Sequence, residues 1–276
     1  MKMKSKLSQK LAFVMLAIFA TGCTMKKEPD NPSAEQAVGK LSALGAYYMP
    51  YDRSVSMMRA NMVRDAALAV GARSGLAFRS KQINGTTIKY DTGLTQVFNF
   101  NGLVLDDNVL PPVLVESDNN LHLANDVTIR VSDRNFEIIR QAKFVTAAPT
   151  WQDYLMLRYN PPEDPDPSIM PKSPGERAIW RQYIQKGWSA GIKQAESIFK
   201  ENLARLKRDF SGMVRYHSLL SQNMVTPPYV GTIEMGITGD SKQVNVNDRI
   251  LRITALPELK SDSGAWRTVV IRNDRK

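Results

Sequence analysis

The sequence predicts an α+β fold, in which helices flank a β-rich middle. Three observations support this class. Apolar residues recur at helical spacing from about 174 to 221, short apolar or alternating runs fill residues 76–145, and a pair of strand-like segments follows the long helix. Because strands and helices do not alternate one by one, a doubly wound parallel sheet is not expected.

The first element expected is a helix from about Ser54 to Val70. Its apolar side chains recur at helical spacing, at Val55, Met58, Met62, Ala66 and Ala69. Gly71 and Gly75 follow this run. Glycines in this place predict the end of the helix and a turn.

The middle of the chain predicts short strands. Apolar or alternating runs, separated by Asn, Asp, Gly and Pro, occur at 86–90, 95–100, 113–116 and 127–131. Pro111 and Pro112 interrupt the apolar stretch 98–116, so this stretch cannot form one continuous central strand. Residues 160–174 then hold six of the chain's fifteen prolines, which predicts a semi-rigid connector at a domain boundary.

A long amphipathic helix is expected from about 174 to 221. Ser173 suits the N-cap, Pro174 suits the first helical position, and Glu176 completes a capping box. Apolar residues follow at steps of three and four: Trp180, Ile184, Trp188, Ile192, Ala195, Phe199, Leu203, Leu206, Phe210 and Met213. Such a stripe favours a place in the core over an exposed interface.

A β-hairpin is expected at the end of the chain. Strand-like runs at 229–238 and 243–254 flank the turn residues Gly239 and Asp240. With the proline-rich segment as connector, we expect a mixed α/β body at 41–159. The part from 175 to 276 then holds the long helix and the C-terminal strands, either in the same domain or as a second lobe.

An export signal occupies residues 1–22. Lysines at positions 2, 4, 6 and 10 precede an apolar run at 11–20, which is too short to serve as a bilayer-spanning helix. The tetrapeptide Ala20-Thr21-Gly22-Cys23 resembles the lipobox of bacterial lipoproteins, in which the cysteine thiol takes a diacylglyceryl group. We therefore expect lipidation at Cys23, the only cysteine. An ordinary secretory signal beside a cysteine is the alternative.

The segment after the lipobox is expected to be a flexible tether. Residues 23–40 are polar and charged, and they offer little apolar surface to bury. Loss of the signal with its four lysines lowers the formal net charge from +10 to +6. The remaining excess lies in residues 171–276, which hold 18 basic and 10 acidic residues. A solvated helix face explains this excess better than nucleic-acid binding, since no aromatic side chains are interleaved with the basic ones.

No catalytic, cofactor-binding or metal-binding residues are expected. Gly187-Trp188-Ser189-Ala190-Gly191 matches the G-x-S-x-G pattern of hydrolases, but that motif needs a strand, a sharp turn and a helix. Here it lies inside the long helical stripe, so its small residues predict close helix packing. The two histidines, His122 and His217, lack metal-ligand spacing. The chain is therefore not expected to be an enzyme.

Five longer segments resemble the DotC family, lipoproteins of type IVB secretion systems of the Dot/Icm kind and of I-type plasmid conjugation systems. These segments are RSGLAFRSKQIN at 73–84, FNFNGLVLDDNVLPPVLVE at 98–116, IIRQAKFVTAAPTWQDYL at 138–155, the stretch 187–230, and VNDRILRITALPEL at 246–259.

The resemblance implies a structural subunit of the outer-membrane core complex. Such a subunit acts with a DotD-like lipoprotein to place a DotH-like channel subunit at the outer membrane, within a large ring-shaped hetero-oligomer. It implies a lipid-anchored protein facing the periplasm, and no direct nucleic-acid binding. Thr24, rather than aspartate, follows Cys23, which favours outer-membrane sorting. Two alternatives stay open: a lipid-anchored envelope enzyme using Ser189, and a cell-wall or DNA-binding module.

Overall fold

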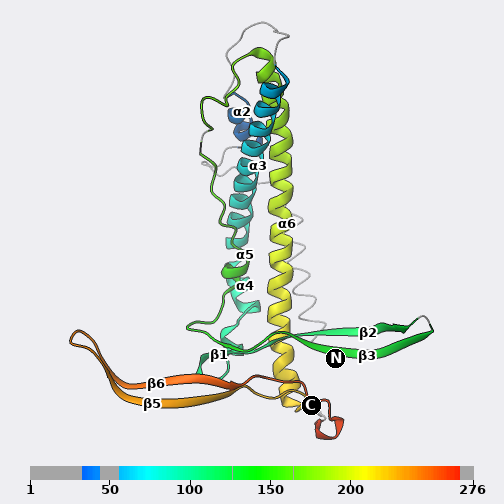
Figure 1. Cartoon of the computed structure of the whole chain (residues 1–276), viewed down its shortest axis with the longest axis vertical. Helices are drawn as coiled ribbons and strands as arrows, with labels where there is room; N and C mark the ends of the chain where they lie inside the picture. Colours follow the sequence, from blue (N-terminus) through cyan, green and yellow to red (C-terminus); the bar gives the residue numbers. More distant parts are fainter. Residues whose placement is uncertain (1–32, 44–55, 126, 164, 268–276) are drawn as a thin grey trace, which may run out of the picture. The chain divides into compact units, whose positions relative to one another are not determined.

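The computed structural model describes residues 33–43, 56–125, 127–163 and 165–267. Within these residues the expected α+β class is confirmed, with a long helix followed by a C-terminal β-hairpin (Figure 1). The signal at 1–22, Cys23 and the tether up to residue 32 lie outside the described residues.

The chain groups into two compact units, each built from two stretches of sequence. Of the described residues, the first unit contains those up to 92 and those within 155–202, and the second contains those within 93–154 and those from 203 to 267. The long helix α6 (Pro174–Ser221) contributes its first part to the first unit and its last part to the second. Its bounds confirm the prediction from the sequence. The division into domains at 160–174 remains a prediction, although that segment itself lies within the first unit.

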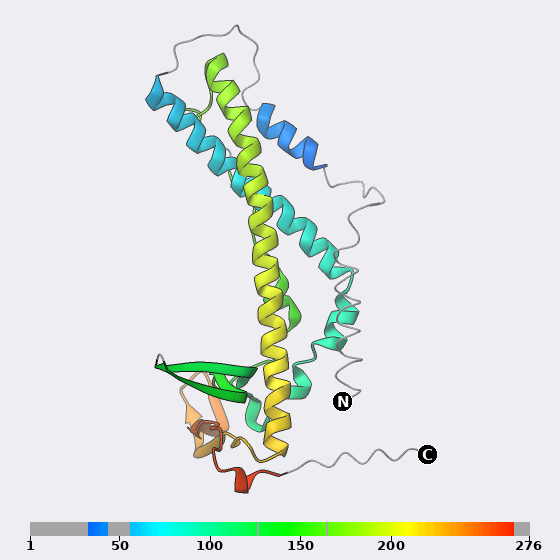
Figure 2. The same cartoon turned by 90° about the vertical axis from the view of Figure 1, so that its right-hand side faces the viewer.

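In the first unit, helix α3 (Met57–Ile88) crosses α6 at two pairs of glycines (Figures 1 and 2). A Cβ built on Gly71 would lie 2.5 Å from the carbonyl oxygen of Ile184, and one on Gly75 would meet the carbonyl of Trp188. From the other side, Gly187 and Gly191 lie against backbone carbonyls of α3 in the same way. The two backbones are therefore in direct contact.

This crossing corrects two predictions. Gly71 and Gly75 do not end the first helix, which begins after the N-cap Ser56 and continues to Ile88. The strand expected at 86–90 is also wrong. Residues 86–88 form the last turn of α3, and residues 89 and 90 form a turn after it. Each glycine costs about 1 kcal/mol of helix propensity. Close packing against α6 offsets this cost. The prediction failed because the residues around Gly71 and Gly75 do not indicate a contact with a helix that is distant in the sequence.

Helix α2 (Ala34–Ala43) packs against the core beside this crossing. Val63, Ala67 and Ile184 are fully buried together with Trp180, whose indole Nε1 donates to the carbonyl of Leu41 at 3.1 Å. Ser33 caps α2 and exchanges hydrogen bonds with Gln36 in a capping box. The expectation of an unstructured tether is therefore wrong for residues 34–40.

The α6 stripe forms core in both units, as predicted. Eight of its ten apolar residues are buried, and only Ile192 and Phe210 keep partial exposure. At the start of α6, the amide of Glu176 donates to Ser173 Oγ at 3.2 Å. The carboxylate of Glu176 accepts from the amide of Lys172 at 2.7 Å rather than from Ser173. The predicted capping box is thus confirmed in a shifted form.

Glu176 also connects the starts of the two long helices. Its carboxylate pairs with Arg59 of α3, with 3.2 Å between Oε1 and Nε. Arg59 further donates to the carbonyls of Ser168 and Met170, both at 2.8 Å. Burial raises the pKa of Glu176, but the Lys172 amide and Arg59 outweigh this effect and hold the pKa below its usual value.

The proline-rich segment is held along α3. Near its start, Asn84 of α3 both donates to the carbonyl of Leu157 at 2.8 Å and accepts from the Leu157 amide at 3.0 Å. Arg59 holds the carbonyls at its other end. The segment is therefore fastened to the first unit at both ends.

The second unit holds the strands. Three two-stranded antiparallel sheets form from β1 (Val109–Leu110) with β4 (Lys143–Phe144), β2 (Val113–Asn125) with β3 (Thr128–Arg140), and β5 (Tyr229–Gly239) with β6 (Val244–Ala255). The shorter elements are α4 (Asp91–Val97), α5 (Trp151–Leu155) and the 3₁₀ turns η1 (Asn101–Leu103), η2 (Asp106–Asn108) and η3 (Ser263–Ala265).

The strands expected at 113–116 and 127–131 are confirmed, since they lie in β2 and at the start of β3, and the same elements decide three further predictions. The break at Pro111-Pro112 is confirmed, because these two residues separate β1 from β2. The hairpin after the long helix is confirmed, with each strand end within one residue of the prediction. The strand expected at 95–100 is wrong. Leu94 and Phe98 are buried at helical spacing around α4, and Phe100 packs edge-on against Phe210 of α6.

A buried carboxylate organises the core of the second unit. Asp209 is fully buried on α6 and pairs with Arg140 at 2.8 Å and with Arg208 at 3.2 Å. The hydroxyl of Tyr154 donates to the same carboxylate at 3.1 Å. Burial, together with the charge of Asp209, raises the pKa of Tyr154 to about 12. These contacts join α5, the end of β3 and α6.

Candidate functional site

The hydrolase-like pentapeptide has a structural explanation. Ser189 lies exposed in the middle of α6, whereas Gly187 and Gly191 on either side form the crossing with α3. The prediction that these small residues mark close helix packing is confirmed. The strand and sharp turn of a nucleophile elbow do not occur here.

The described residues hold no group of three or more His, Cys, Asp or Glu side chains placed to bind a metal ion. His217 lies on α6, and its Nε2 is 2.9 Å from the carbonyl oxygen of Leu103. None of the helices in the described ranges is both long enough and apolar enough to cross a membrane. Cys23, the one residue to which the sequence gives a chemical role, is outside the described residues.

The β2–β3 hairpin is the first candidate for a functional surface. At its root, Leu114 packs in a buried cluster with Tyr216, Leu219 and Val225. Glu116 accepts from Arg215 of α6 at 3.0 Å. The root is therefore fixed to the core of the second unit.

The outer half of the same hairpin exposes apolar side chains. Cross-strand partners share a face of the ribbon, and the pairs Leu121↔Val131 and Leu123↔Ile129 form one face. All four side chains are between 59% and 66% exposed. We call these four residues the β2–β3 patch. A sheet in a folded domain ordinarily packs its apolar face on other elements, but none of the described residues covers this one.

The β5–β6 hairpin repeats this arrangement. Its exposed aliphatic side chains form the cross-strand pairs Ile233↔Ile250 and Ile237↔Val246, with Val244 beside the turn. These five residues, the β5–β6 patch, are between 49% and 74% exposed. Polar pairs lie next to them in the ladder, Glu234↔Arg249 beside the first and Thr238↔Asn245 beside the second. Between these two aliphatic pairs the ladder is irregular at Gly236 and Asn247, both at positive φ, and the hydroxyl of Thr238 donates to the carboxylate of Asp248.

The root of the β5–β6 hairpin is held by the chain that enters and leaves it. The amide of Thr226 donates to the carbonyl of Glu258 at 2.9 Å, and that of Lys260 donates to Met224 at 2.9 Å. Asn223 donates to the carbonyl of Ala265 at 2.7 Å. Both hairpins thus have fixed roots and uncovered apolar faces. An isolated two-stranded hairpin is only marginally stable in water, so these faces suit contact with another molecule.

The sequence contained a signal for these surfaces. Residues 244–253 alternate apolar and polar side chains along most of their length, and residues 129–138 alternate less regularly. The apolar positions change parity along each strand, from 129 and 131 to 136 and 138, and from 244, 246 and 250 to 251 and 253, so apolar side chains are expected on both faces. The pattern does not show which of these side chains the same chain covers. The sequence alone therefore predicted the C-terminal hairpin but not its role.

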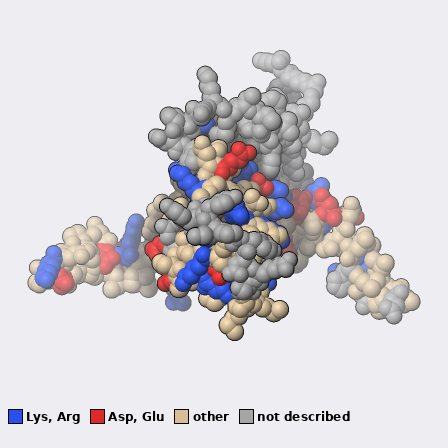
Figure 3. Space-filling model, turned by 90° about the horizontal axis from the view of Figure 1, so that it is seen from above, with Lys and Arg blue, Asp and Glu red and all other residues tan. Residues whose placement is uncertain are grey.

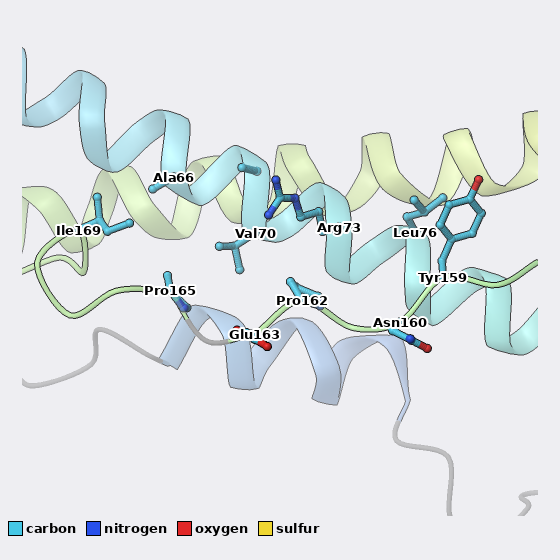
Figure 4. Close-up of a pocket in the computed structure, with 11 residues that line it drawn as sticks. Ala66, Val70, Arg73, Leu76, Tyr159, Asn160, Pro162, Glu163, Pro165 and Ile169 are labelled. Carbon is cyan, nitrogen blue, oxygen red and sulfur yellow. The ribbon is translucent and has the colours of Figure 1, made fainter.

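A hollow of about 530 Å³ lies between α3 and the proline-rich segment (Figure 4). Val70 and Leu76 of α3 form one wall, and Tyr159, Pro162 and Pro165 form the other. The charged side chains in its lining are Arg73 and Glu163. With prolines and aliphatic side chains dominating the lining, the hollow offers few polar groups that could orient a ligand.

Charged side chains do not gather into one basic field on the face that Figure 3 shows. Lysine and arginine there are interspersed with acidic and uncharged residues. On α6, exposed Lys193 and Lys200 lie beside Glu196 and Glu201. This distribution fits a solvated helix face.

Comparison with protein families decides the general role. Residues 57–268 match the family T4SS_TraI, described as type IV secretory system, conjugal DNA-protein transfer. The chain belongs to this family. It is therefore a protein of a conjugation-related type IV secretion system. No curated protein matches the chain significantly.

The T4SS_TraI match begins with the first residue of α3 and ends after η3. It therefore includes the glycine crossing, the buried Asp209 and both hairpins. It does not include the signal, Cys23 or α2. The expectation of a lipid anchor thus rests on the N-terminal sequence alone, whereas the crossing and the hairpins are features of the matched region.

Proposed function

We propose that this T4SS_TraI family member is a lipid-anchored assembly subunit of the outer-membrane core complex of a type IVB secretion or conjugative transfer system. Its role is structural and not enzymatic. The observation that carries the proposal is the pair of hairpins with fixed roots and exposed apolar faces. Proteins of type IV secretion systems work within multi-subunit complexes, and such faces supply the contact surfaces that a subunit needs.

The proposal assigns the anchor and the partners as follows. Acylated Cys23 holds the chain in the outer membrane, with the described residues facing the periplasm. The resemblance to the DotC family names a DotD-like lipoprotein and a DotH-like channel subunit as partners within a ring-shaped assembly. The chain then acts with the first to place the second at the outer membrane.

The test replaces Cys23 with serine in the full chain. The expected result is loss of labelling by a fatty-acid analogue and a shift of the DotH-like subunit away from the outer-membrane fraction. Thr21→Ser keeps a small residue before the cysteine and is the matched control, for which labelling and fractionation stay normal. Normal placement of the DotH-like subunit with unlabelled Cys23→Ser would contradict the proposed role.

A further inference from the structure

The two hairpins of the second unit differ in the residues at their outer ends. At the β5–β6 turn, residues 240–243 are polar or charged, and all are exposed. At the β2–β3 turn, aliphatic side chains continue to the end of the hairpin. Val127, just before β3, is 93% exposed, more than any other large apolar side chain among the described residues. We call the β2–β3 patch together with Val127 the apolar tip.

The composition of the apolar tip suits a lipid surface. The tip consists only of leucine, isoleucine and valine, which are among the side chains that transfer most favourably into a bilayer. The residues that dominate binding between proteins are instead enriched in Trp, Tyr and Arg, whereas Leu and Val are under-represented. The whole segment from Ser117 to Asn135 contains no aromatic residue. Its exposed aliphatic area, on the order of a few hundred Å², is large enough to mark an interaction site.

The charge beside the tip complements phospholipid head groups. Arg130 lies between Ile129 and Val131 in β3, so its side chain belongs to the opposite, polar face of the ribbon. Arg130 is exposed and forms no ion pair with another described residue. A guanidinium group binds phosphate well, and a basic polar face opposite an apolar face is typical of elements that lie in the membrane interface. Asp126, the acidic residue of this stretch, lies outside the described residues.

The backbone limits how deeply the tip can enter a bilayer. A two-stranded ribbon has unpaired N–H and C=O groups along both outer edges, and such groups cannot lie unpaired in the hydrocarbon core. In the head-group region they can bond to water and lipid. At the turn, the amide of Val127 donates to Asn125 Oδ1 at 3.1 Å and is thus satisfied within the chain. The expected insertion is therefore shallow, about 5–10 Å.

We propose that the apolar tip of the β2–β3 hairpin inserts into the surface of a phospholipid bilayer, with Arg130 at the level of the lipid phosphates. The root of the hairpin is fixed to the core of the second unit through Leu114 and Glu116. Insertion of the tip therefore orients that core against the membrane, which a lipid on Cys23 alone does not do. The inference rests on the proposed function only for the choice of the outer membrane, and the β5–β6 hairpin remains available for protein contacts.

A fluorescent label at the tip tests the insertion. In the full chain, Val127→Cys carries a maleimide dye, and the protein is reconstituted in vesicles of phosphatidylethanolamine and phosphatidylglycerol. The unsubstituted chain, whose only cysteine is Cys23, gives the background. Lipids with a nitroxide on the acyl chain should quench this dye about threefold more than a dye at Asn135→Cys, an exposed position nearer the root of the same strand. Equal quenching at the two positions would overturn the inference.

A charge placed on the apolar face gives a second readout. Leu123→Asp in the Val127→Cys chain is expected to lower the quenching about threefold, because a carboxylate resists transfer into the bilayer. Asn120→Asp is the matched control that leaves the quenching unchanged, since the pair Asn120↔Ser132 lies next to Leu121↔Val131 and hence on the opposite face. Equal loss with both variants would show repulsion by anionic lipid in place of insertion, and would overturn the inference.

The remaining outcomes separate this inference from the proposed function. An unquenched tip dye in a chain that still carries a fatty acid on Cys23 would overturn the inference and leave the anchor standing. A quenched tip dye in a chain without fatty acid on Cys23 would support the inference and overturn the anchor. Crosslinking of Val127→Cys to a protein in donor cells, with no quenching in vesicles, would assign the tip to a protein partner and overturn the inference.

Discussion

The glycine crossing of the first unit and the hairpins of the second unit differ in how closely their residues are packed. At the crossing, α3 and α6 approach so closely that even a methyl group at Gly75 would meet a backbone carbonyl. In the hairpins, side chains as large as isoleucine extend into solvent with no described residue over them. The first region completes its packing within the chain. The second region leaves apolar surface for another molecule. The contrast separates what stabilises the fold from what is available for assembly.

The largest expected effect on stability comes from closing the crossing. Gly75→Ala should destabilise the full chain by about 2–3 kcal/mol, because the added Cβ meets backbone that cannot move aside. Gly85→Ala, on the same helix but with no atom within 4 Å, should stabilise it by about 0.5–1 kcal/mol. Denaturant unfolding of the detergent-purified protein measures both. Equal effects at the two sites would contradict direct backbone contact at Gly75.

A slightly smaller effect is expected at the buried carboxylate of the second unit. Asp209→Ala should cost about 2 kcal/mol, because it leaves the Tyr154 hydroxyl without its acceptor and Arg140 without its partner. Asp209→Asn retains an acceptor for Tyr154 and should cost less. In addition, Asp209→Asn should lower the pKa of Tyr154, since the Asp209 charge contributes to raising it to about 12. Ultraviolet titration of the tyrosines measures this shift.

Glu176 should make a modest, pH-dependent contribution of about 1 kcal/mol through its capping contacts. Its pKa is lower in the folded chain than in the unfolded chain. The contribution is therefore fully present above the unfolded value near 4.5, and it is lost as the pH falls through the lower folded value. Glu176→Gln should remove this part of the acid sensitivity. Unfolding measured from pH 7 down to pH 3 compares the two proteins, and parallel curves would contradict the role of Glu176.

The smallest effect on stability, within about 0.5 kcal/mol, is expected in the hairpins. Ile237→Asp should leave the unfolding free energy of the isolated chain nearly unchanged, because this side chain is exposed. It should nevertheless lower conjugal transfer at least about tenfold if the patch is covered in the assembly. Asn245→Asp, whose pair with Thr238 follows the Ile237 pair directly and so lies on the opposite face, is the control for a charge without loss of the aliphatic side chain. Normal transfer with Ile237→Asp would argue against a role for this face.

Ser189→Ala should change neither stability nor transfer measurably. The serine is exposed on α6, and only the glycines beside it contact α3. A strong loss of transfer with this variant, in a chain that still folds, would favour the alternative of an envelope enzyme. The same assay on Gly191→Ala, which obstructs the crossing, shows what a structural defect does to transfer.

Local sequence predicted best the elements whose signals lie within the element itself. The α6 bounds followed from a cap at Ser173, a proline at the first position and a continuous apolar stripe. The C-terminal hairpin followed from two strand-like runs around Gly239 and Asp240. The errors at Gly71, Gly75 and 95–100 arose where packing on α6 outweighed local preference. Ser33 and Gln36 carried the capping signal for α2, which a low apolar content obscured.

By itself, the sequence determined the α+β class, the long helix and its buried stripe, whereas export and lipidation at Cys23 stay predictions. Only the tertiary structure decided that the glycines form a helix crossing and that two hairpins keep an apolar face uncovered. The physical reason is that caps, turns and periodicity act between residues close in the chain. Whether a glycine or an aliphatic face meets a neighbour depends instead on segments far apart in the sequence, such as α3 and α6.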